Sequence, residues 1–457
     1  MATAPKLMLT FYGDDFTGST DAMEALALSG MRTVLFLSPP MPEQLQQKFS
    51  DVRCVGVAGL SRAMTPTEMD EEVEPVLRQL WSLAAPVTHY KLCSTFDSSP
   101  QVGSIGHVAD MAHRTLTPGQ TISVLASAPP LRRYTVFGNH FAAAGEDIFR
   151  LDRHPTMSRH PSTQMLESDL RLHLSKQTSS NIGLMNVAEM AGEAAQVTAC
   201  HAAKLQSKPD LLLYDALTDE HLRTVGRLIW QQATERQHFS IGSSGVEYAL
   251  TAHWRDSGVI TDEPAALAPL KPVEQLLVVS GSASPLTAQQ IDWASANGFD
   301  CIRVSAETLV QPEREEQARR ALFDQALASL TGGNSVVLYS AAGPDDPSIE
   351  RVRRQLAASP GGRLQNTAKL LGCAMGRVTR DLLAPTGLRR VVIAGGDTSS
   401  YAAQELGLYG LEMCAKLTPG APLCRAYSES DPFDGLEIAF KGGQMGQVDY
   451  FGLARGQ

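Results

Sequence analysis

Two glycine-rich loops, one near each end of the chain, place the strongest constraint on the fold. The first loop, Gly13–Thr20, follows the apolar run Leu7–Tyr12 and precedes a helix-like run. The second loop, Gly395–Ser400, follows the apolar run Val391–Ala394 and also precedes a helix-like segment. A strand, a tight loop and a helix in this order are typical of α/β sheets, where such loops lie at the carboxyl ends of the strands and bind ligands.

The first loop carries adjacent carboxylates. Its glycine spacing imitates a P-loop, but Ser19 stands where the phosphate-binding lysine would be, and Asp14 and Asp15 occupy the cradle. These charges would repel a triphosphate. Two aspartates at the end of a strand can instead accept hydrogen bonds from sugar hydroxyls or take a proton from one. An aspartate that caps the following helix is the structural alternative, but two in succession exceed what a cap needs.

The second loop has the opposite character. Gly395 and Gly396 let an anion approach the backbone, and the free amides at the start of the next helix, with the hydroxyls of Thr398 to Ser400, suit a phosphate. The sequence therefore predicts a polyol site near one end of the chain and a phosphate site near the other.

Composition excludes several classes of partner. The chain has 457 residues, of which 43% are hydrophobic and 19% are charged, as in ordinary globular proteins. Its formal net charge of −10 disfavours nucleic acid and anionic membranes as partners. An anionic substrate would therefore need a local basic pocket. The seven cysteines include no C-x-x-C pair, Met1–Lys6 lacks the features of a signal peptide, and no apolar run reaches bilayer length. These features predict a cytoplasmic protein.

The length is too great for one ordinary core and favours two or three domains, of which we choose two. We place the boundary at the Pro/Ala-rich stretch after Gly258, which predicts an N-terminal domain over 1–258, a linker over 259–273 and a C-terminal domain over 274–457. Short apolar runs alternate with helical patterns on both sides of it. We therefore expect two α/β domains with largely parallel sheets that face a central cleft. Strands are expected at 33–37, 52–58, 87–92, 122–126, 211–214, 276–279, 335–339, 390–394, 423–427 and 436–440.

Several ordered motifs resemble the four-carbon acid sugar kinase family, ATP-dependent enzymes that phosphorylate tetronates, 3-oxo-tetronates and related sugar acids. The family loop D-D-[FL]-T-G-[AS] is matched by Asp14–Ser19, and its block C-S-T-F-D-S is matched by Cys93–Ser98. Four further motifs follow in family order, at Gly242–Gly245, Ser280–Pro285, Gly395–Ser399 and Lys441–Gly446. Together the matches span almost the whole chain.

The resemblance implies roles for residues of the first domain. Asp14 and Asp15 would bind the acceptor hydroxyl and take its proton, and we favour Asp15 as the base. Arg62 matches a family Ser-Arg position and could recognise a carboxylate through its planar fork. We also expect Arg159, in a proline-punctuated basic loop, to touch the substrate. The polar segment that begins at Lys91 would form a pocket wall rather than a solvated turn, with substrate contacts from Lys91, Ser94, Thr95 and Asp97.

The resemblance also implies a nucleotide site in the second domain. We expect ATP to contact the strand-to-helix turn through Ser280, Gly281 and Ser282, and the glycine loop through Gly395, Gly396, Asp397 and Thr398. Asp397 is the candidate ligand for Mg²⁺, which prefers few carboxylates together with phosphate oxygens. Lys441 and Gly443 would close over the nucleotide, anchored by Phe440 and Phe451.

Relatives with the Cys-Ser-Thr-Phe-Asp block act on 3-oxo acids, so 3-oxo-isoapionate and 3-oxo-tetronate are the first candidate substrates, followed by threonate and erythronate. The stretch Pro100–Ser104 departs from many relatives and tilts the choice toward the branched acid. A non-enzymatic sugar-acid sensor and an NAD-dependent oxidoreductase are the alternatives. No G-x-G-x-x-G follows an expected strand, which counts against the oxidoreductase. A homodimer is left open as an assembly.

Overall fold

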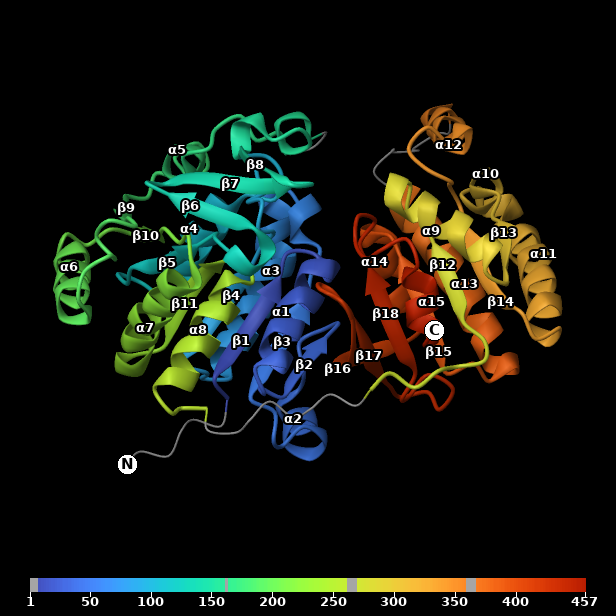
Figure 1. Ribbon diagram of the computed structural model, residues 1–457, viewed down its shortest axis with the longest axis horizontal. Helices are drawn as coiled ribbons and strands as arrows, with labels where there is room; N and C mark the ends of the chain where they lie inside the picture. The colour runs from blue at the N-terminus through green and yellow to red at the C-terminus, as the bar shows by residue number, and fades with distance from the viewer. Residues whose placement is uncertain (1–6, 161–162, 261–268, 359–366) are drawn as a thin grey trace. The chain divides into compact units, whose positions relative to one another are not determined.

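The computed structural model describes residues 7–160, 163–260, 269–358 and 367–457, apart from the side chains of 358, 368 and 397. The chain forms two compact units, Met1–Ala265 and Ala266–Gln457. Each unit contains a mainly parallel sheet flanked by helices (Figure 1). The expected α/β class with largely parallel sheets is therefore confirmed. Residues 261–268, the larger part of the predicted linker, lie outside the described residues.

The sheet of the first unit is parallel throughout, in the order β2-β3-β1-β4-β11-β5-β10-β9. Parallel strands are covered on both faces, which explains why their sequences are nearly continuous apolar runs. The strands are β1 (Leu9–Gly13), β2 (Thr33–Phe36), β3 (Cys54–Ala58), β4 (Val87–Lys91), β5 (Ile122–Leu125), β9 (Ile182–Met185), β10 (Leu211–Tyr214) and β11 (His238–Gly242).

Helices cover both faces of this sheet. On one face the Thr10 hydroxyl of β1 bonds to the Leu80 carbonyl of α3, and on the other His89 of β4 bonds to Glu247 of α8. Side chains alternate along strands, so these contacts lie on opposite sides of the sheet. The helices are α1 (Phe16–Leu28), α2 (Pro42–Lys48), α3 (Pro66–Ser82), α4 (Ile105–Thr115), α5 (Leu170–Leu174), α6 (Ala194–Gln206), α7 (Asp219–Glu235) and α8 (Gly245–Asp256), with 3₁₀ turns η1 (Ser61–Ala63), η2 (Pro129–Leu131), η3 (Leu151–Arg153) and η4 (Met157–Arg159).

A small antiparallel sheet, which the sequence did not predict, also belongs to the first unit. Its strands are β6 (Arg133–Val136), β7 (Asn139–Ala144) and β8 (Asp147–Arg150). The β6–β7 turn contains Phe137 and Gly138, both with positive φ. The amides of these two residues donate to the Asp215 carboxylate just after β10, which ties the hairpin to the carboxyl end of the large sheet.

The second unit has the strand order β13-β14-β12-β15-β18-β17-β16, parallel up to β18 and antiparallel beyond it. Its strands are β12 (Leu277–Ser280), β13 (Phe299–Arg303), β14 (Ser335–Tyr339), β15 (Arg390–Ala394), β16 (Leu408–Thr418), β17 (Ala421–Ser428) and β18 (Glu437–Lys441). Its helices are α9 (Pro285–Ala296), α10 (Ala306–Leu309), α11 (Pro312–Thr331), α12 (Pro347–Ala358), α13 (Thr367–Thr386), α14 (Gly396–Glu405) and α15 (Tyr450–Arg455).

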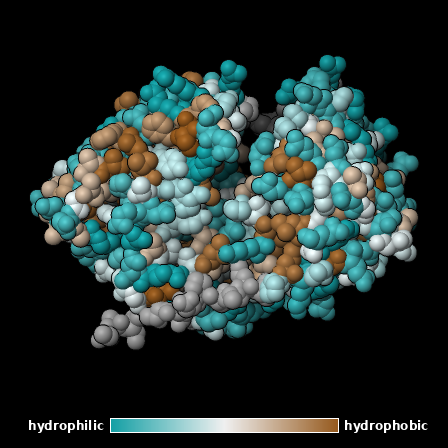
Figure 2. Space-filling model, viewed as in Figure 1, coloured by the Kyte–Doolittle hydropathy of each residue, from teal (hydrophilic) through white to brown (hydrophobic). Residues whose placement is uncertain are grey.

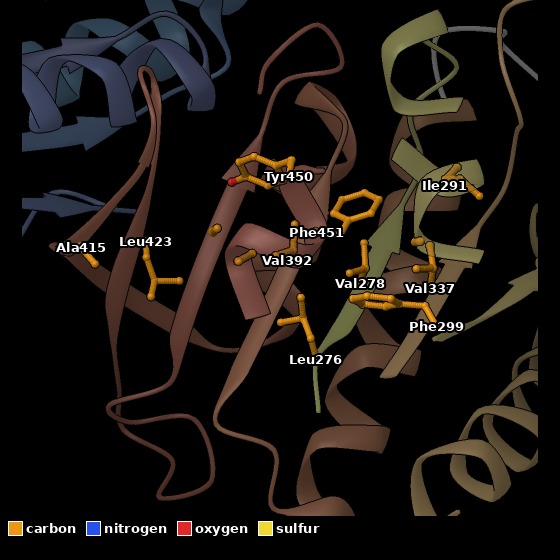
Figure 3. Packing of buried hydrophobic residues seen from close by; sticks show 13 residues of the cluster. Leu276, Val278, Ile291, Phe299, Val337, Val392, Ala415, Leu423, Tyr450 and Phe451 are labelled. Atoms are coloured by element: carbon orange, nitrogen blue, oxygen red, sulfur yellow. The ribbon is translucent and has the colours of Figure 1, made fainter. Parts of the chain in front are cut away.

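A hydrophobic cluster joins the central strands of the second unit to α9 and α15 (Figure 3). Val278 of β12 and Val392 of β15 meet Phe451 of α15, which is fully buried, as is Tyr450 beside it. The expected apolar anchors, Phe440 and Phe451, are both buried and hold the segment that follows β18. This segment is therefore anchored at both ends by buried residues and is not a loose tail.

One buried guanidinium fastens the two ends of the second unit. Arg390, at the start of β15, pairs with Glu437 and donates to the carbonyls of Lys271 and Ala454. A further backbone bond joins Val273 to Arg455. An arginine can make these contacts at once because its donors are fixed in one plane.

The face of the molecule seen in Figure 2 is mainly hydrophilic, with separate hydrophobic patches. Single exposed apolar residues are ordinary on protein surfaces. Among the described residues, no helix combines the length and apolar character needed to cross a bilayer. The seven cysteines all lie in described segments and all are free thiols.

Candidate functional site

The acidic loop lies where three adjacent strands end. Gly13, the last residue of β1, is level with Ala58 of β3 and with Lys91 of β4. Beyond this level the Asp14 amide donates to the Lys91 carbonyl at 2.8 Å, and the Arg62 amide donates to the Asp14 carbonyl at 3.0 Å. Residues from three separate parts of the sequence are thus brought together at one edge of the sheet.

Arg62 bonds to both aspartates. Its Nη2 donates to Asp14 Oδ1 at 2.9 Å and to Asp15 Oδ1 at 2.7 Å, and its Nε donates to Asp14 Oδ2 at 3.2 Å. The fork that was expected to receive a substrate carboxylate therefore already holds Asp14. Its Nη1 forms no hydrogen bond with a described residue, so this one group remains open to a ligand.

Asp15 caps α1 and still reaches solvent. Its Oδ1 accepts the Gly18 amide at 2.9 Å, and its Oδ2 accepts the Thr17 hydroxyl at 2.7 Å. The capping interpretation is therefore correct for Asp15, while Asp14 caps nothing. The Asp15 side chain is 20% exposed and that of Asp14 only 4%, so Asp15 is the more accessible of the two.

The two aspartates have different affinities for protons. Burial raises the pKa of Asp14 to about 6, against the opposing effect of Arg62. Burial would also raise the pKa of Asp15, but Arg62, Lys91 and the hydrogen bonds of the helix cap outweigh it and hold this pKa below its usual value. At neutral pH Asp15 is therefore firmly ionised, whereas Asp14 can take up a proton under mild acid.

Lys91 lies buried next to the acidic loop. It is 1% exposed, its Nζ donates to the Leu92 carbonyl at 3.0 Å, and it lies 3.9 Å from Asp21 Oδ2. A Cβ on Gly18 would be 2.4 Å from Asp15 Oδ1 and 2.9 Å from Lys91 Nζ. Gly18 is therefore required for the close approach of these groups. Lys91 acts on the acidic loop through its charge, and the structure buries it rather than exposing it in a pocket wall.

The Cys93–Ser98 loop holds its polar groups in a local chain. Thr95 Oγ1 bonds to Cys93 Sγ and donates to Asp97 Oδ1. Phe96 is buried with a φ of 59°, which is rare for a bulky side chain and persists only where the surroundings impose it. Ser98 supplies part of that restraint, because its hydroxyl bonds to His173 and Gln177. These hydrogen bonds restrain the loop and hold its polar groups in place.

The structure does not join every predicted residue to this group. Arg159 lies at the end of η4 with an exposed side chain, and no contact connects it to the other predicted residues in the described segments. His140 is a supporting residue that the sequence did not indicate. Its Nε2 donates to the Ser94 carbonyl at 2.8 Å, from a strand of the unpredicted hairpin.

In the second unit, the predicted nucleotide loops follow β12, β15 and β18. The Gly281 amide donates to the Ala394 carbonyl, and the Gly395 amide donates to the Lys441 carbonyl. A Cβ on Gly281 would be 2.0 Å from Thr398 Oγ1, so the loops after β12 and β15 need a glycine where they touch. The structure therefore brings Ser280–Ser282 and Gly395–Thr398 together, as the sequence predicted.

The start of α14 is open to a ligand. Gly395 precedes it with a φ of 120°, a conformation suited to glycine, and a Cβ on Gly396 would meet no atom within 4 Å. The first amides of a helix lack partners within it and attract anions. The Asp397 side chain, the predicted magnesium ligand, lies outside the described part, and no cluster of three metal-binding side chains occurs among the described residues.

Lys441 is a buried cation with neutral partners. It is fully buried, and its Nζ donates to Thr287 Oγ1 at 3.2 Å and to the carbonyls of Gly442 and Gly443 at 2.9 and 3.4 Å. Burial lowers its pKa to about 8. The Gly443 carbonyl also accepts hydroxyl bonds from Ser284 and Thr287 at the start of α9. Lys441 thus fixes the Gly442–Gly443 turn, and Thr287 is a partner that the sequence did not indicate.

The chain matches two family models, one in each half. Residues 9–250 match a sugar-binding N-terminal domain, and residues 277–451 match a nucleotide-binding C-terminal domain. The chain is 46% identical over 449 residues to a 3-oxo-isoapionate kinase of Paraburkholderia graminis, covering 98% of this chain and 94% of that protein. It is 30% identical over 456 residues to a 3-oxo-tetronate kinase of Pseudomonas fluorescens, covering 99% and 97%.

Two solved structures share the fold. A Salmonella typhimurium LT2 protein, described as a tRNA synthase, superimposes with a TM-score of 0.78 at 23% identity, covering 98% of each chain. A Haemophilus influenzae protein superimposes with a TM-score of 0.71 at 24% identity, covering 98% of this chain and 99% of the other. At these identities the likeness concerns the fold alone.

Proposed function

The chain belongs to the four-carbon acid sugar kinase family, and we propose that it transfers the γ-phosphoryl group of ATP to a hydroxyl of a 3-oxo sugar acid, with 3-oxo-isoapionate as the first candidate. The observation that carries the choice of substrate is the 46% identity, over nearly the whole chain, to a 3-oxo-isoapionate kinase. 3-Oxo-tetronate is the second candidate, because relatives at lower identity carry that name. Threonate and erythronate follow.

The acceptor hydroxyl is bound by the acidic loop. Asp15 is ionised and partly exposed, so it accepts the hydroxyl proton as the oxygen attacks the γ-phosphorus and the bond to the ADP oxygen breaks. Asp14 is held by two hydrogen bonds from Arg62, and in this proposal it keeps Arg62 oriented toward the acceptor site. The free Nη1 of Arg62 is available to a substrate oxygen, and Lys91 keeps Asp15 ionised from beneath the loop.

The pocket wall and the basic loop complete the acceptor site in this proposal. Ser94, Thr95 and Asp97 present hydroxyl and carboxylate groups that suit a polyhydroxy acid, and their loop is restrained by His140 and Ser98. Arg159, exposed on η4, remains a proposed substrate contact that would require the loop to approach the ligand.

The nucleotide is bound by the loops of the second unit. The first amides of α14 and the Thr398 hydroxyl bind phosphate oxygens, and Gly396 leaves room for them. Ser280, Gly281 and Ser282 form the facing loop, and Gly443 lies beside Ser282. Lys441 contributes positive charge near the nucleotide while its Nζ holds the Gly442–Gly443 turn in place. The arrangement in which both ligand sites face one cleft stays a prediction.

Mg²⁺ is expected with ATP. Ser282 and Thr398 lie beside Gly395 at the open helix start and carry hydroxyls of the kind that Mg²⁺ accepts as ligands, and Asp397 is the proposed carboxylate ligand. When bound, the ion would neutralise charge on the phosphate oxygens. A cytoplasmic location, which free thiols favour, and a homodimeric assembly are further parts of the proposal.

ADP release tests the function. Purified protein should release ADP from ATP and Mg²⁺ with 3-oxo-isoapionate or 3-oxo-tetronate, and more slowly with threonate or erythronate. Phosphorus NMR should identify the product as a phosphate ester. Reduction of NAD(P)⁺ by a sugar acid would instead support the oxidoreductase, and stabilisation by a sugar acid without turnover would support the sensor. Either result in the absence of ADP release would overturn the proposal.

A further inference from the structure

The β6–β7 hairpin turns one of its faces toward the Cys93–Ser98 loop. Thr135 of β6 lies opposite His140 of β7, and Thr135 Oγ1 bonds to His140 Nδ1 at 2.9 Å. His140 Nε2 must carry the proton, because it bonds to the carbonyl of Ser94 at 2.8 Å. The Ser127 hydroxyl completes the chain by donating to Thr135 at 2.7 Å. The face that bears Thr135 and His140 is therefore the face that meets the loop.

Arg133 projects from this same face. Side chains two positions apart along a strand point to the same side, so Arg133 shares the side of Thr135. Its partner across the hairpin is Ala142, which is buried and small enough to leave space for a long side chain. Two backbone bonds with Ala128, just beyond the end of β5, fix the position of Arg133 at the carboxyl edge of the large sheet.

The guanidinium of Arg133 is incompletely satisfied. Its Nη1 donates to the carbonyls of Leu131 and Arg132, but its Nε is buried without a hydrogen-bond partner. It forms no ion pair with a carboxylate of the described residues. Burial lowers the pKa of this guanidinium, and the nearby Cys93 and Asp97 oppose that effect. Arginine nevertheless stays protonated, so the charge faces the pocket wall without a counter-charge in contact.

The Arg133 side chain is partly exposed, so a ligand can reach it, and its buried Nε is an unpaired donor that costs free energy until an acceptor satisfies it. The other arginine of the acceptor site cannot fill this role with its fork, because Arg62 already binds Asp14 and Asp15. We propose that Arg133 binds the carboxylate of the sugar acid, beside the Cys93–Ser98 loop. The inference rests on the proposed function, because it assigns the recognition of the acid group in that same site.

The assignment separates two tasks. The acidic loop handles the hydroxyl that becomes phosphorylated, and Arg133 selects substrates that carry a carboxylate. A neutral polyol would then bind weakly although it offers the same hydroxyls. Because Arg133 does not touch the reacting oxygen, its loss should affect substrate affinity more than the rate at saturation.

The test compares two neighbouring arginines. Arg133→Gln removes the proposed contact, and Arg132→Gln is the matched control, because Arg132 donates to the carbonyls of Gly145 and Glu146 in the next hairpin turn. With 3-oxo-isoapionate, KM should rise about 10- to 100-fold in Arg133→Gln, as expected for a hydrogen bond to a charged group, and stay within about twofold in Arg132→Gln. The kcat of both variants should remain close to that of the wild type.

The carboxamide of the same acid provides a second measurement. The wild type should prefer the acid to the carboxamide, and Arg133→Gln should lose most of that preference while Arg132→Gln keeps it. Arg133→Lys retains the charge but not the planar fork, so its preference for the acid should lie between that of the wild type and that of Arg133→Gln. This variant replaces Arg133→Gln in the test if circular dichroism shows that Arg133→Gln does not fold. Calorimetric binding of the acid in the absence of ATP should follow the same order.

The outcomes distinguish the two proposals. If the wild type phosphorylates no sugar acid, the proposed function fails. If the wild type is active but Arg133→Gln and Arg133→Lys keep the wild-type KM and the preference for the acid, Arg133 does not bind the carboxylate. A fall in kcat without a change in KM or preference would also overturn the inference, because it would indicate a role in the reaction or in folding.

Discussion

Gly396 provides the sharpest test of the nucleotide site. A Cβ at this position would meet no protein atom within 4 Å, whereas one on Gly281 would lie 2.0 Å from Thr398 Oγ1. Valine at position 396 therefore projects into space that the proposal assigns to the phosphates. Valine at position 281 would instead collide with the protein itself.

The expected magnitudes differ accordingly. Gly396→Val exchanges a poor helix former for a better one at the start of α14, which should leave stability within about 0.5 kcal/mol of the wild type. Loss of one amide bond to a charged phosphate costs about 1.5–3 kcal/mol, so the Kd for an ATP analogue should rise at least tenfold. Gly281→Val should lose about 1–3 kcal/mol of stability through overpacking.

Calorimetry measures the affinity of each variant for a non-hydrolysable ATP analogue and for the sugar acid. Thermal unfolding measures the stability of each variant. Gly396→Val should unfold at the same temperature as the wild type. It should bind the sugar acid normally and the nucleotide weakly. Normal nucleotide binding by Gly396→Val would refute the assignment of this loop to phosphate. Loss of the sugar acid alone would refute the division of tasks between the two units.

Three further predictions concern the acidic loop. Asp15→Asn should lower kcat by about 10²–10⁴ while nucleotide binding persists, since asparagine can still cap α1; near-normal turnover alongside an inactive Asp14→Asn variant would transfer the role of base to Asp14. Arg62→Lys should raise KM and also lower kcat, because it loses the planar contacts with both aspartates, whereas Arg78→Lys in an exposed pair should change neither; unchanged kinetics would remove Arg62 from the site. Because burial raises the pKa of Asp14 from 3.8 to about 6, the folded protein binds this proton more tightly than the unfolded chain, so the penalty for its charge is present above pH 6 and is relieved as the pH falls toward 3.8. Thermal unfolding at pH 7 and pH 5 should show this relief in the wild type but not in Asp14→Asn, and equal shifts in both proteins would contradict it.

Apolar runs predicted the strands well, because parallel strands covered on both faces leave little room for polar residues. The strand Leu211–Tyr214 lies where the pattern placed it. The pattern missed β9, β11, β13 and β16 of the large sheets, and β11 contains His238 and Ser240, both buried. His238 is accommodated by a hydrogen bond to Ser123, more than a hundred residues away, and no local pattern could indicate this partner.

The motifs likewise predicted which residues gather at the ends of the strands, but not how they pair. No pattern in the sequence indicates that Arg62 bonds to the aspartates 47 and 48 positions earlier. The motif also indicated that Lys441 offsets phosphate charge, but it did not indicate that Nζ bonds to a hydroxyl and two carbonyls of its own unit. Charge in a motif indicates that a site exists, while the direction of the charged group depends on contacts that only the folded chain supplies.

The guanidinium of Arg390 has a consequence for modularity. By binding the carbonyls of both Lys271 and Ala454, it places the entry and exit of the second unit side by side. A unit whose two connections are adjacent can be inserted into a surface loop of a host protein, or be circularly permuted, without stretching its sheet. We therefore expect the second unit to tolerate such a rearrangement, and we expect a version without Arg390 to tolerate it less well.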